Sequence, residues 1–291
     1  KDAISTLNWS RDGKHLIVGL QSRAGLHLLR LSDMSIVASD TEYLDKIMEV
    51  DVRQDGIVAS TALDGMTRLY DRNLKILGRR AIQGGAKPSS LRFSPDGNLI
   101  AIGFIDAPAV TVVNTRDLSL AFSPDSTRVK EQASFTSVAW SSDGRFLYAG
   151  GDYRGNGTNP IYRWSEGGKA AIERIPLADN RIAEIQQMGA GNMAFVTEDP
   201  SFGIIGADAR RIAFRGPDII DFSDAQSYLA ASADGSLIRY PLKRGGELLQ
   251  AFSPGQAGDQ NLSAIPKQTV LPPLLKSAEI RIDNWKNSFT P

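Results

Sequence analysis

The sequence contains no cysteine and only two histidines, and these absences exclude several kinds of chemistry. Without cysteine there are no disulfides, no thiolate nucleophiles and no thiolate metal sites. His15 and His27 are too few for a histidine metal centre, which needs three or four convergent ligands, so we expect both to pack within strands or lie at the surface. A Ser-His-Asp triad is formally possible, but the Gly-x-Ser-x-Gly pattern of a nucleophile elbow is missing. We therefore expect no metal, no cofactor and no catalytic residue.

Net charge and long apolar runs are missing as well. The 33 basic residues balance the 33 acidic ones, so the formal net charge is zero at pH 7. This balance gives no electrostatic support for nucleic acid or a membrane as a partner. No apolar run approaches the length of a membrane helix, and the start does not resemble a signal peptide. Because the chain begins at Lys1 directly in a strand pattern, we interpret it as a fragment of a longer protein, and we expect a cytoplasmic location.

A short turn motif recurs at a nearly constant interval. Ser94-Pro95-Asp96-Gly97 stands between an alternating apolar stretch and a short apolar run, and Asp-Gly supplies the positive φ that a tight hairpin needs. Related motifs end in Asp12-Gly13, Asp55-Gly56 and Asp143-Gly144, and successive aspartates of the series are 43, 41 and 47 residues apart. A period near forty residues predicts a repeat architecture. A degenerate fifth repeat carries Ala190-Gly191 at the same place.

Each repeat predicts four antiparallel strands joined by tight turns, which is the content of one propeller blade. We therefore predict an all-β protein, a single β-propeller domain over residues 1–291, with six recognisable repeats of four-stranded blades and a partial seventh. The expected blades are residues 4–40, 47–82, 88–125, 135–177, 182–216 and 219–252, with the partial blade at 267–291.

The sequence is compatible with two ways of closing the ring. An open ring leaves two edge strands that invite aggregation, and propellers normally close with a strand borrowed from the other terminus. The strand pattern weakens after Phe252. One alternative is a seven-bladed ring whose last blade is incomplete in this sequence, and the other is six blades with an elaborated tail.

The repeat resembles the WD40 family. The recurring unit is Ser94-Pro95-Asp96-Gly97 or a variant of it, a short apolar strand, Asp-Gly and a strand that ends in Tyr70-Asp71 or Trp164-Ser165, and the resemblance covers six units and most of the chain. The Trp-Asp dipeptide and the Gly-His pair are both absent, so the hydrogen-bonded His–Ser/Thr–Trp network of the animal-type repeat cannot form. The resemblance implies a divergent, bacterial type of propeller, found as a module of multidomain proteins that include chains with a caspase-like peptidase domain.

Two features of the repeats are candidates for binding. The first is an aspartate at the second turn of four repeats: Asp64, Asp152, Asp199 and Asp234. These carboxylates could form an acidic ring around the channel for a cation or a basic peptide, but an aspartate at a turn usually accepts backbone N–H bonds, and we favour this capping role. No Asp-x-Asp-x-Asp loop supports calcium. The second feature is the glycine-rich insertion 151–160, which is as typical of a tolerated insertion as of a binding loop.

Four aromatic residues are predicted to occupy equivalent strand positions: Trp9, Phe93, Trp140 and Trp164. Each blade of a propeller must bury one face against the next blade. We therefore expect these side chains to form the core between blades.

We expect a non-catalytic propeller that recruits or senses a protein or peptide, in trans or within the same chain, and regulates a domain outside this sequence. The second turns and the connectors between blades should form the partner-binding face: Arg23, Lys46, Asp64, Met66, Lys87, Asp106, Tyr153, Arg154, Arg181, Ser201 and Asp234. One alternative is a propeller enzyme or small-ligand binder that uses the central channel through Asp64 and Asp234. Another is a structural spacer in a larger assembly.

Overall fold

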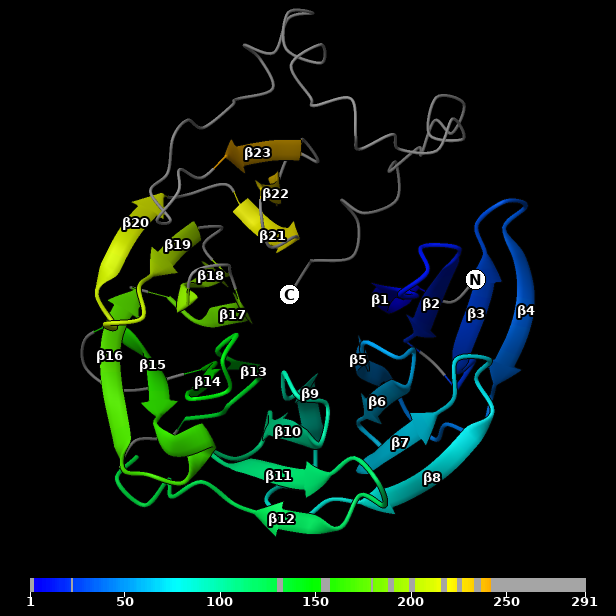
Figure 1. The fold of residues 1–291 in the computed structure, drawn as a ribbon, viewed down its shortest axis with the longest axis horizontal. Coiled ribbons are helices and arrows are strands. Elements are labelled where there is room, and N and C mark those ends of the chain that lie inside the picture. Colours follow the sequence, from blue (N-terminus) through cyan, green and yellow to red (C-terminus); the bar gives the residue numbers. More distant parts are fainter. Residues whose placement is uncertain are drawn as a thin grey trace, which may run out of the picture.

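The strands form a ring of antiparallel sheets, which confirms the predicted all-β class (Figure 1). The computed structural model describes residues 3–21, 23–129, 133–152, 158–178, 180–187, 191–198, 202–215, 219–223, 227–232 and 237–241. Within these residues the fold has five four-stranded sheets, one three-stranded sheet and a single 3-10 helix at Glu166–Gly168. None of the helices in this part of the chain is long and apolar enough to cross a membrane.

Within each sheet the strands follow one another in chain order, and the first strand lies nearest the centre of the ring (Figure 1). The first sheet contains β1 (Ile4–Trp9), β2 (His15–Leu20), β3 (Leu26–Arg30) and β4 (Ser35–Asp40). The second contains β5 (Ile47–Val52), β6 (Val58–Ala62), β7 (Met66–Tyr70) and β8 (Ile76–Ala81). The third contains β9 (Pro88–Phe93), β10 (Leu99–Phe104), β11 (Val110–Asn114) and β12 (Leu120–Phe122).

The remaining sheets continue around the ring. The fourth contains β13 (Ser137–Trp140), β14 (Leu147–Gly150), β15 (Asn159–Trp164) and β16 (Ile172–Ala178). The fifth contains β17 (Ile182–Gln187), β18 (Met193–Thr197), β19 (Phe202–Ile205) and β20 (Arg211–Arg215). The three-stranded sheet contains β21 (Ile219–Ser223), β22 (Ser227–Ser232) and β23 (Leu237–Pro241). Residues 242–252 and the partial seventh blade at 267–291 lie outside the described residues, so the number of blades and the closure of the ring stay predictions.

The recurring Ser-x-Asp-Gly motif is a side-chain-capped turn. The Ser94 hydroxyl donates to Asp96 Oδ1 (2.5 Å) and accepts the Leu99 N–H (3.0 Å), while the Asn98 N–H donates to Asp96 Oδ1 (3.1 Å). Gly97 takes φ +72°, which costs glycine far less than other residues. The same bonds recur at Ser10 and Asp12 and at Ser141 and Asp143. The sequence period is therefore a repeated hydrogen-bonding unit.

A second recurring turn, which joins the third and fourth strands of each sheet, escaped the sequence analysis. Each of the first five sheets places one non-glycine residue at positive φ there: Met34 (54°), Leu74 (59°), Leu118 (58°), Glu166 (52°) and Ala209 (66°). Four of these turns carry an aspartate cap, which binds the backbone N–H groups that follow it. The residue at positive φ has no common type, but an aspartate directly precedes it in three of the five turns: Asp33, Asp117 and Asp208.

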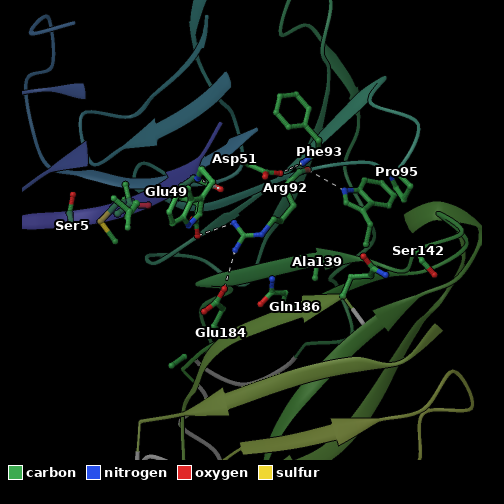
Figure 2. Close-up of a pocket in the computed structure, with 18 of the residues that line it drawn as sticks. Ser5, Glu49, Asp51, Arg92, Phe93, Pro95, Ala139, Ser142, Glu184 and Gln186 are labelled. Carbon is green, nitrogen blue, oxygen red and sulfur yellow. Dashed lines mark hydrogen bonds and ion pairs between the residues drawn. The ribbon is translucent and has the colours of Figure 1, made fainter. Parts of the chain in front are cut away.

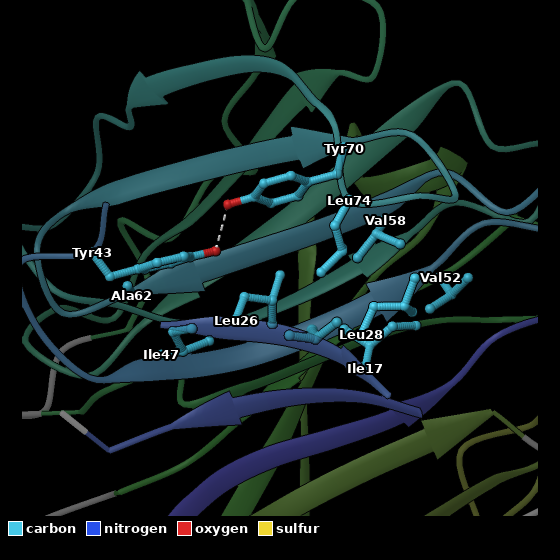
Figure 3. Packing of buried hydrophobic residues seen from close by; sticks show 11 residues of the cluster. Ile17, Leu26, Leu28, Tyr43, Ile47, Val52, Val58, Ala62, Tyr70 and Leu74 are labelled. Atoms are coloured by element: carbon cyan, nitrogen blue, oxygen red, sulfur yellow. Dashed lines mark hydrogen bonds between the residues drawn. The ribbon is translucent and has the colours of Figure 1, made fainter. Parts of the chain in front are cut away.

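The apolar core lies between neighbouring sheets. In Figure 3, Ile17 and Leu28 of the first sheet belong to one buried cluster with Val52 and Val58 of the second. Trp140 and Trp164 are 5% and 0% exposed and share a cluster farther along the ring, as predicted for aromatic residues between blades.

The prediction for the other aromatic positions was partly wrong. Trp164 ends the third strand of its sheet, so its position is not equivalent to those of Trp9, Phe93 and Trp140, which end first strands. Phe93 is half-buried against the core. Trp9 is 53% exposed and borders the central cavity. Side chains at the same position in different blades are therefore not equally buried, because burial also requires side chains of the adjacent sheet to pack against them.

Candidate functional site

The second turns and the connectors meet on one face of the ring, which we call the connector face. Three basic residues occupy the same position there, one residue before a first strand: Lys46, Lys87 and Arg181. The backbone carbonyl of each accepts an N–H from the residue after the second strand, at 2.9, 3.0 and 3.0 Å respectively. This repeated bond fastens each connector to the second turn of its own blade.

Asp64 forms a buried ion pair at this face and does not enter the channel. Its Oδ2 lies 2.7 Å from Arg68 Nη2, and the two side chains are only 2% and 3% exposed. The carboxylate also accepts the N–H groups of Met66 (3.0 Å) and Leu44 (3.2 Å). Burial raises the pKa of Asp64, but the hydrogen bonds from Arg68 and the two N–H groups outweigh it and lower the pKa overall. The favoured capping role is confirmed, and the alternative in which Asp64 acts as a channel carboxylate is wrong.

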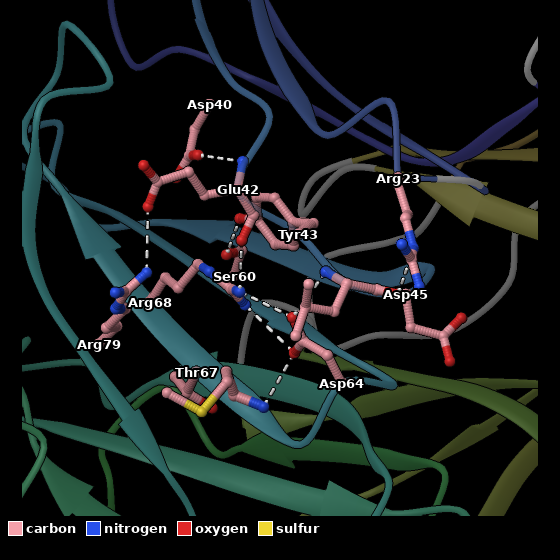
Figure 4. A network of polar contacts seen from close by, with 12 residues as sticks. Arg23, Asp40, Glu42, Tyr43, Asp45, Ser60, Asp64, Thr67, Arg68 and Arg79 are labelled. Atoms are coloured by element: carbon pink, nitrogen blue, oxygen red, sulfur yellow. Dashed lines mark hydrogen bonds and ion pairs between the residues drawn. The ribbon is translucent and has the colours of Figure 1, made fainter.

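Two tyrosines help to hold the same region together: Tyr43 lies in the polar network of Figure 4, and its hydrogen bond to Tyr70 is drawn in Figure 3. The Tyr43 hydroxyl on the connector is 2.6 Å from Ser60 Oγ on β6 and 2.7 Å from the Tyr70 hydroxyl at the end of β7. Tyr70 donates in turn to Asp40 (2.7 Å), and the Arg68 guanidinium lies 4.0 Å from the centre of the Tyr43 ring. Burial raises the pKa of Tyr43 to about 12. The network joins a connector to the second and third strands of the blade. The sequence analysis missed it because it considered only the His–Ser/Thr–Trp network, and neither histidine nor tryptophan takes part here.

Hydrogen bonds fix the backbone of Leu44, while its side chain is exposed to solvent. Its N–H donates to Asp64 Oδ2 (3.2 Å), and its carbonyl accepts from Arg23 Nε (3.2 Å). The preceding residue, Tyr43, is 1% exposed, whereas the Leu44 side chain is 68% exposed. A large apolar side chain therefore projects from a backbone whose polar groups are both bound.

The other predicted site residues have simpler environments. Asp106 is exposed and caps the next connector by accepting the N–H groups of Ala86 (2.8 Å) and Lys87 (3.1 Å). Met66 is half-buried at the start of β7, and Arg181 pairs with Glu198 at 2.6 Å. Asp152 is half-buried, and its backbone carbonyl accepts the Ser134 N–H (3.0 Å). The remaining candidates lie outside the described residues: Tyr153, Arg154, Asp199, Ser201 and Asp234.

A cavity of about 1510 Å³ occupies the centre of the ring and is lined mainly by the first strands of five sheets. Its charged lining residues within the described chain are Arg11, Glu49, Asp51, Arg92, Glu184 and Glu198. Sequence analysis named none of them as site residues. The sequence does show charged residues within the first strands of the blades. However, the alternation of apolar and polar residues along a strand does not show that three such strands converge on one cavity.

Arg92 connects three blades across this cavity (Figure 2). Its Nη1 is 3.0 Å from Glu49 Oε2 and 2.8 Å from the Leu91 carbonyl, and its Nη2 is 3.3 Å from Glu184 Oε1. Glu184 belongs to β17, so this ion pair reaches past the intervening strand β13 (Figure 2). Partial burial raises the pKa of Glu49, against the lowering effect of Arg92.

The cavity carboxylates already have partners in the fold. Asp51 Oδ2 accepts the Phe93 N–H of the next blade (2.9 Å), and Oδ1 accepts the Val52 N–H (2.8 Å). Glu49 and Glu184 contact Arg92, and Glu198 contacts Arg181. Over the described residues, no group of three or more histidine, aspartate or glutamate residues is placed to hold a metal ion. The arrangement suits a structural brace between blades.

Comparisons with known proteins agree with this architecture. A family model described as "WD domain, G-beta repeat" matches residues 130–154, a stretch that includes β13 and β14. A solved structure titled "Crystal Structure of Mitotic Checkpoint Complex" superposes with a TM-score of 0.67 at 15% sequence identity, covering 83% of this chain and 75% of that one. The fold is that of a β-propeller, and one stretch of it matches the WD40 repeat. No curated protein has a matching sequence.

Proposed function

We propose that this WD40-type propeller is a non-catalytic protein-interaction and sensor module that binds a protein or peptide through its connector face. The observation that carries the proposal is Leu44, whose side chain is 68% exposed while both backbone polar groups are bound. Burying an exposed apolar side chain against a partner is favourable, and association loses less conformational entropy when the segment that carries the side chain is already ordered.

The wider setting of the module is also part of the proposal. We place it in the cytoplasm, as the regulatory module of a larger bacterial protein such as one with a caspase-like peptidase domain. The support is the divergent repeat described above, in which Ser-x-Asp-Gly turns are kept and the Trp-Asp dipeptide is absent. In this setting the partner is another protein or another domain of the same chain.

The test is affinity capture from the native source with the purified chain and with Leu44→Asp. A matched control is Leu77→Asp on β8, where the leucine is 57% exposed away from the connector face. We expect a partner that binds the original chain and the control but not Leu44→Asp. A partner retained equally by all three chains would contradict the assignment of the face.

A second function, binding of a small ligand in the central cavity, is favoured by one observation. Trp9 borders the cavity and is 53% exposed, and an accessible aromatic ring is a common element of ligand sites. Intrinsic tryptophan fluorescence during a metabolite screen tests it. A ligand that changes the emission of the original chain but not of Trp9→Phe would support this function.

A further inference from the structure

We propose that residues 267–291 of this chain dock against the uncovered side of the first sheet and close the ring as part of a seventh blade. The inference goes beyond the proposed function, because it concerns the side of the first blade and not its connector face. It also selects one of the two ways of closing the ring. The docking surface, which we call the open face, consists of Leu7, Trp9, Leu16, Val18 and Leu29.

One position of the first strands shows what normally covers this side of a blade. The third residue from the end of each first strand is apolar in the first five sheets, and it is 0% exposed in the second to fifth: Val50, Leu91, Val138 and Ile185. In the first sheet the same position is Leu7, which is 49% exposed. Val50 is buried in a cluster with Ile17 and Leu28 of the preceding sheet. Leu7 therefore lacks the cover that a preceding sheet gives its counterparts.

The open face extends over three strands. Asn8 Nδ2 donates to the Val50 carbonyl (3.0 Å), so Asn8 faces the second sheet, and its neighbours Leu7 and Trp9 lie on the opposite side because successive side chains of a strand alternate. Leu7 is paired with Val18, and Trp9 with Leu16, which is in turn paired with Leu29. Directly opposed residues of antiparallel strands share one face of the sheet. These side chains therefore form one continuous apolar surface.

The six described sheets do not cover the open face. Among the described strands outside the first sheet, only β5 makes extensive contact with it, and β5 lies on the opposite side (Figure 1). The sixth sheet contacts the fifth through β21 and β18 but makes no comparable contact with the first. A ring of these six sheets is therefore open beside β1, where a seventh blade would stand.

The sequence after Pro241 can supply the missing layer. Residues 242–266 form a connection that can extend up to about 80 Å, which is ample for reaching a neighbouring blade position. In residues 278–283, alanine and isoleucine alternate with charged residues, the pattern of a strand with one buried face. An apolar run with Leu274 and Leu275 precedes it. The segment thus offers apolar side chains to the open face, and burying Leu7 and Trp9 against them is favourable.

Photo-crosslinking of the full chain identifies the occupant directly. Leu7 is replaced by p-benzoyl-phenylalanine, the purified chain is irradiated, and the crosslinked peptides are identified by mass spectrometry. We expect a crosslink within one chain, from position 7 to a peptide of residues 267–291. The matched control carries the same photoreactive residue in place of Leu77, which is 57% exposed on β8, and should give no crosslink to that segment.

A smaller substitution provides an independent measurement. Because the sequence has no cysteine, Leu7→Cys and Leu77→Cys each introduce a single thiol, and circular dichroism verifies that both variants are folded. If the open face is covered, the thiol at position 7 should react with a disulfide reagent at least about tenfold more slowly than the thiol at position 77, because its reaction requires local opening.

Several outcomes would overturn the inference. Crosslinks from position 7 to β22 or β23 would indicate a six-bladed ring, and crosslinks between two chains would make a second copy the occupant. Equal reaction rates of the two thiols, with no crosslink to residues 267–291, would mean that the face is uncovered, which would leave Trp9 available for the small-ligand function. The proposed binding through the connector face would survive each of these results, because affinity capture with Leu44→Asp tests it separately.

Discussion

Arg92 on β9 reaches Glu184 on β17, with Nη2 and Oε1 3.3 Å apart, although the two residues are separated by 92 positions and by the strand β13. Because Arg92 also contacts Glu49 at 3.0 Å, one guanidinium links the second, third and fifth blades. A contact that skips a blade restrains the curvature of the ring in a way that contacts between adjacent blades do not. We infer that this brace stabilises the propeller.

Replacing Arg92 with methionine should therefore destabilise the fold by about 2–3 kcal/mol, between the values for exposed and fully buried ion pairs. Partial burial already raises the pKa of Glu49, and removing the cation raises it further. The carboxyl then takes up a proton more readily, so the penalty should shrink between about pH 7 and about pH 5. Urea unfolding at both pH values measures this difference. Equal penalties at the two values would show that Glu49 does not respond to Arg92.

Tyr43→Phe removes the hydroxyl that Ser60 and Tyr70 share and should cost about 1–3 kcal/mol. It should also change the alkaline stability profile. The pKa of Tyr43 is raised to about 12 by burial, whereas an unfolded tyrosine titrates at about 10. The unfolded chain therefore ionises first, and the stability from Tyr43 is lost as pH rises from about 10 to about 12. Melting temperatures measured over this pH interval should fall less for the variant than for the original chain. An equal fall for both chains would contradict the raised pKa of Tyr43.

Asp143→Asn tests the capped first turns at acid pH. Hydrogen bonds from Ser141 and from the Arg145 N–H hold the pKa of Asp143 down at about 2. A lowered pKa means that the stabilisation is present above about pH 4 and disappears as pH falls towards 2. Because the side chain is 44% exposed, we expect a cost below about 1 kcal/mol at neutral pH and none near pH 2. Denaturant titrations at both pH values measure this. Ser142→Ala, at an exposed neighbour, should be neutral at both.

Met34 and Leu74 provide a matched pair for backbone strain. Both have positive φ, 54° and 59°, but Met34 is 56% exposed and Leu74 is 6% exposed. Met34→Gly should relieve the strained conformation and stabilise the protein by up to about 1 kcal/mol. Leu74→Gly also relieves strain but empties a core position, so a net loss of about 2–4 kcal/mol is expected. Melting temperatures of the two variants should shift in opposite directions. A destabilised Met34→Gly would mean that its exposed side chain makes contacts that outweigh the strain.

The candidate site was only partly predictable. The second turns and connectors were correctly expected to share a face, because antiparallel strands of similar length return their turns to the same side. The capping role of Asp64 was also expected from turn chemistry. In contrast, its burial against Arg68, the exposure of Leu44 and the tyrosine network each depend on how a connector folds over its own blade. Connectors have no periodic pattern from which this path can be derived.

The amino-acid sequence by itself determined the repeated unit: capped Asp-Gly turns, short alternating strands and the period that relates them. These features are local, because a turn such as Ser94–Gly97 is specified by side chains a few residues apart. Only the tertiary structure decided which atoms cover Trp140 but not Trp9, and which carboxylates meet Arg92. Strand alternation specifies the side on which a residue lies, whereas burial and ion pairing depend on the sheets that the ring brings next to that side.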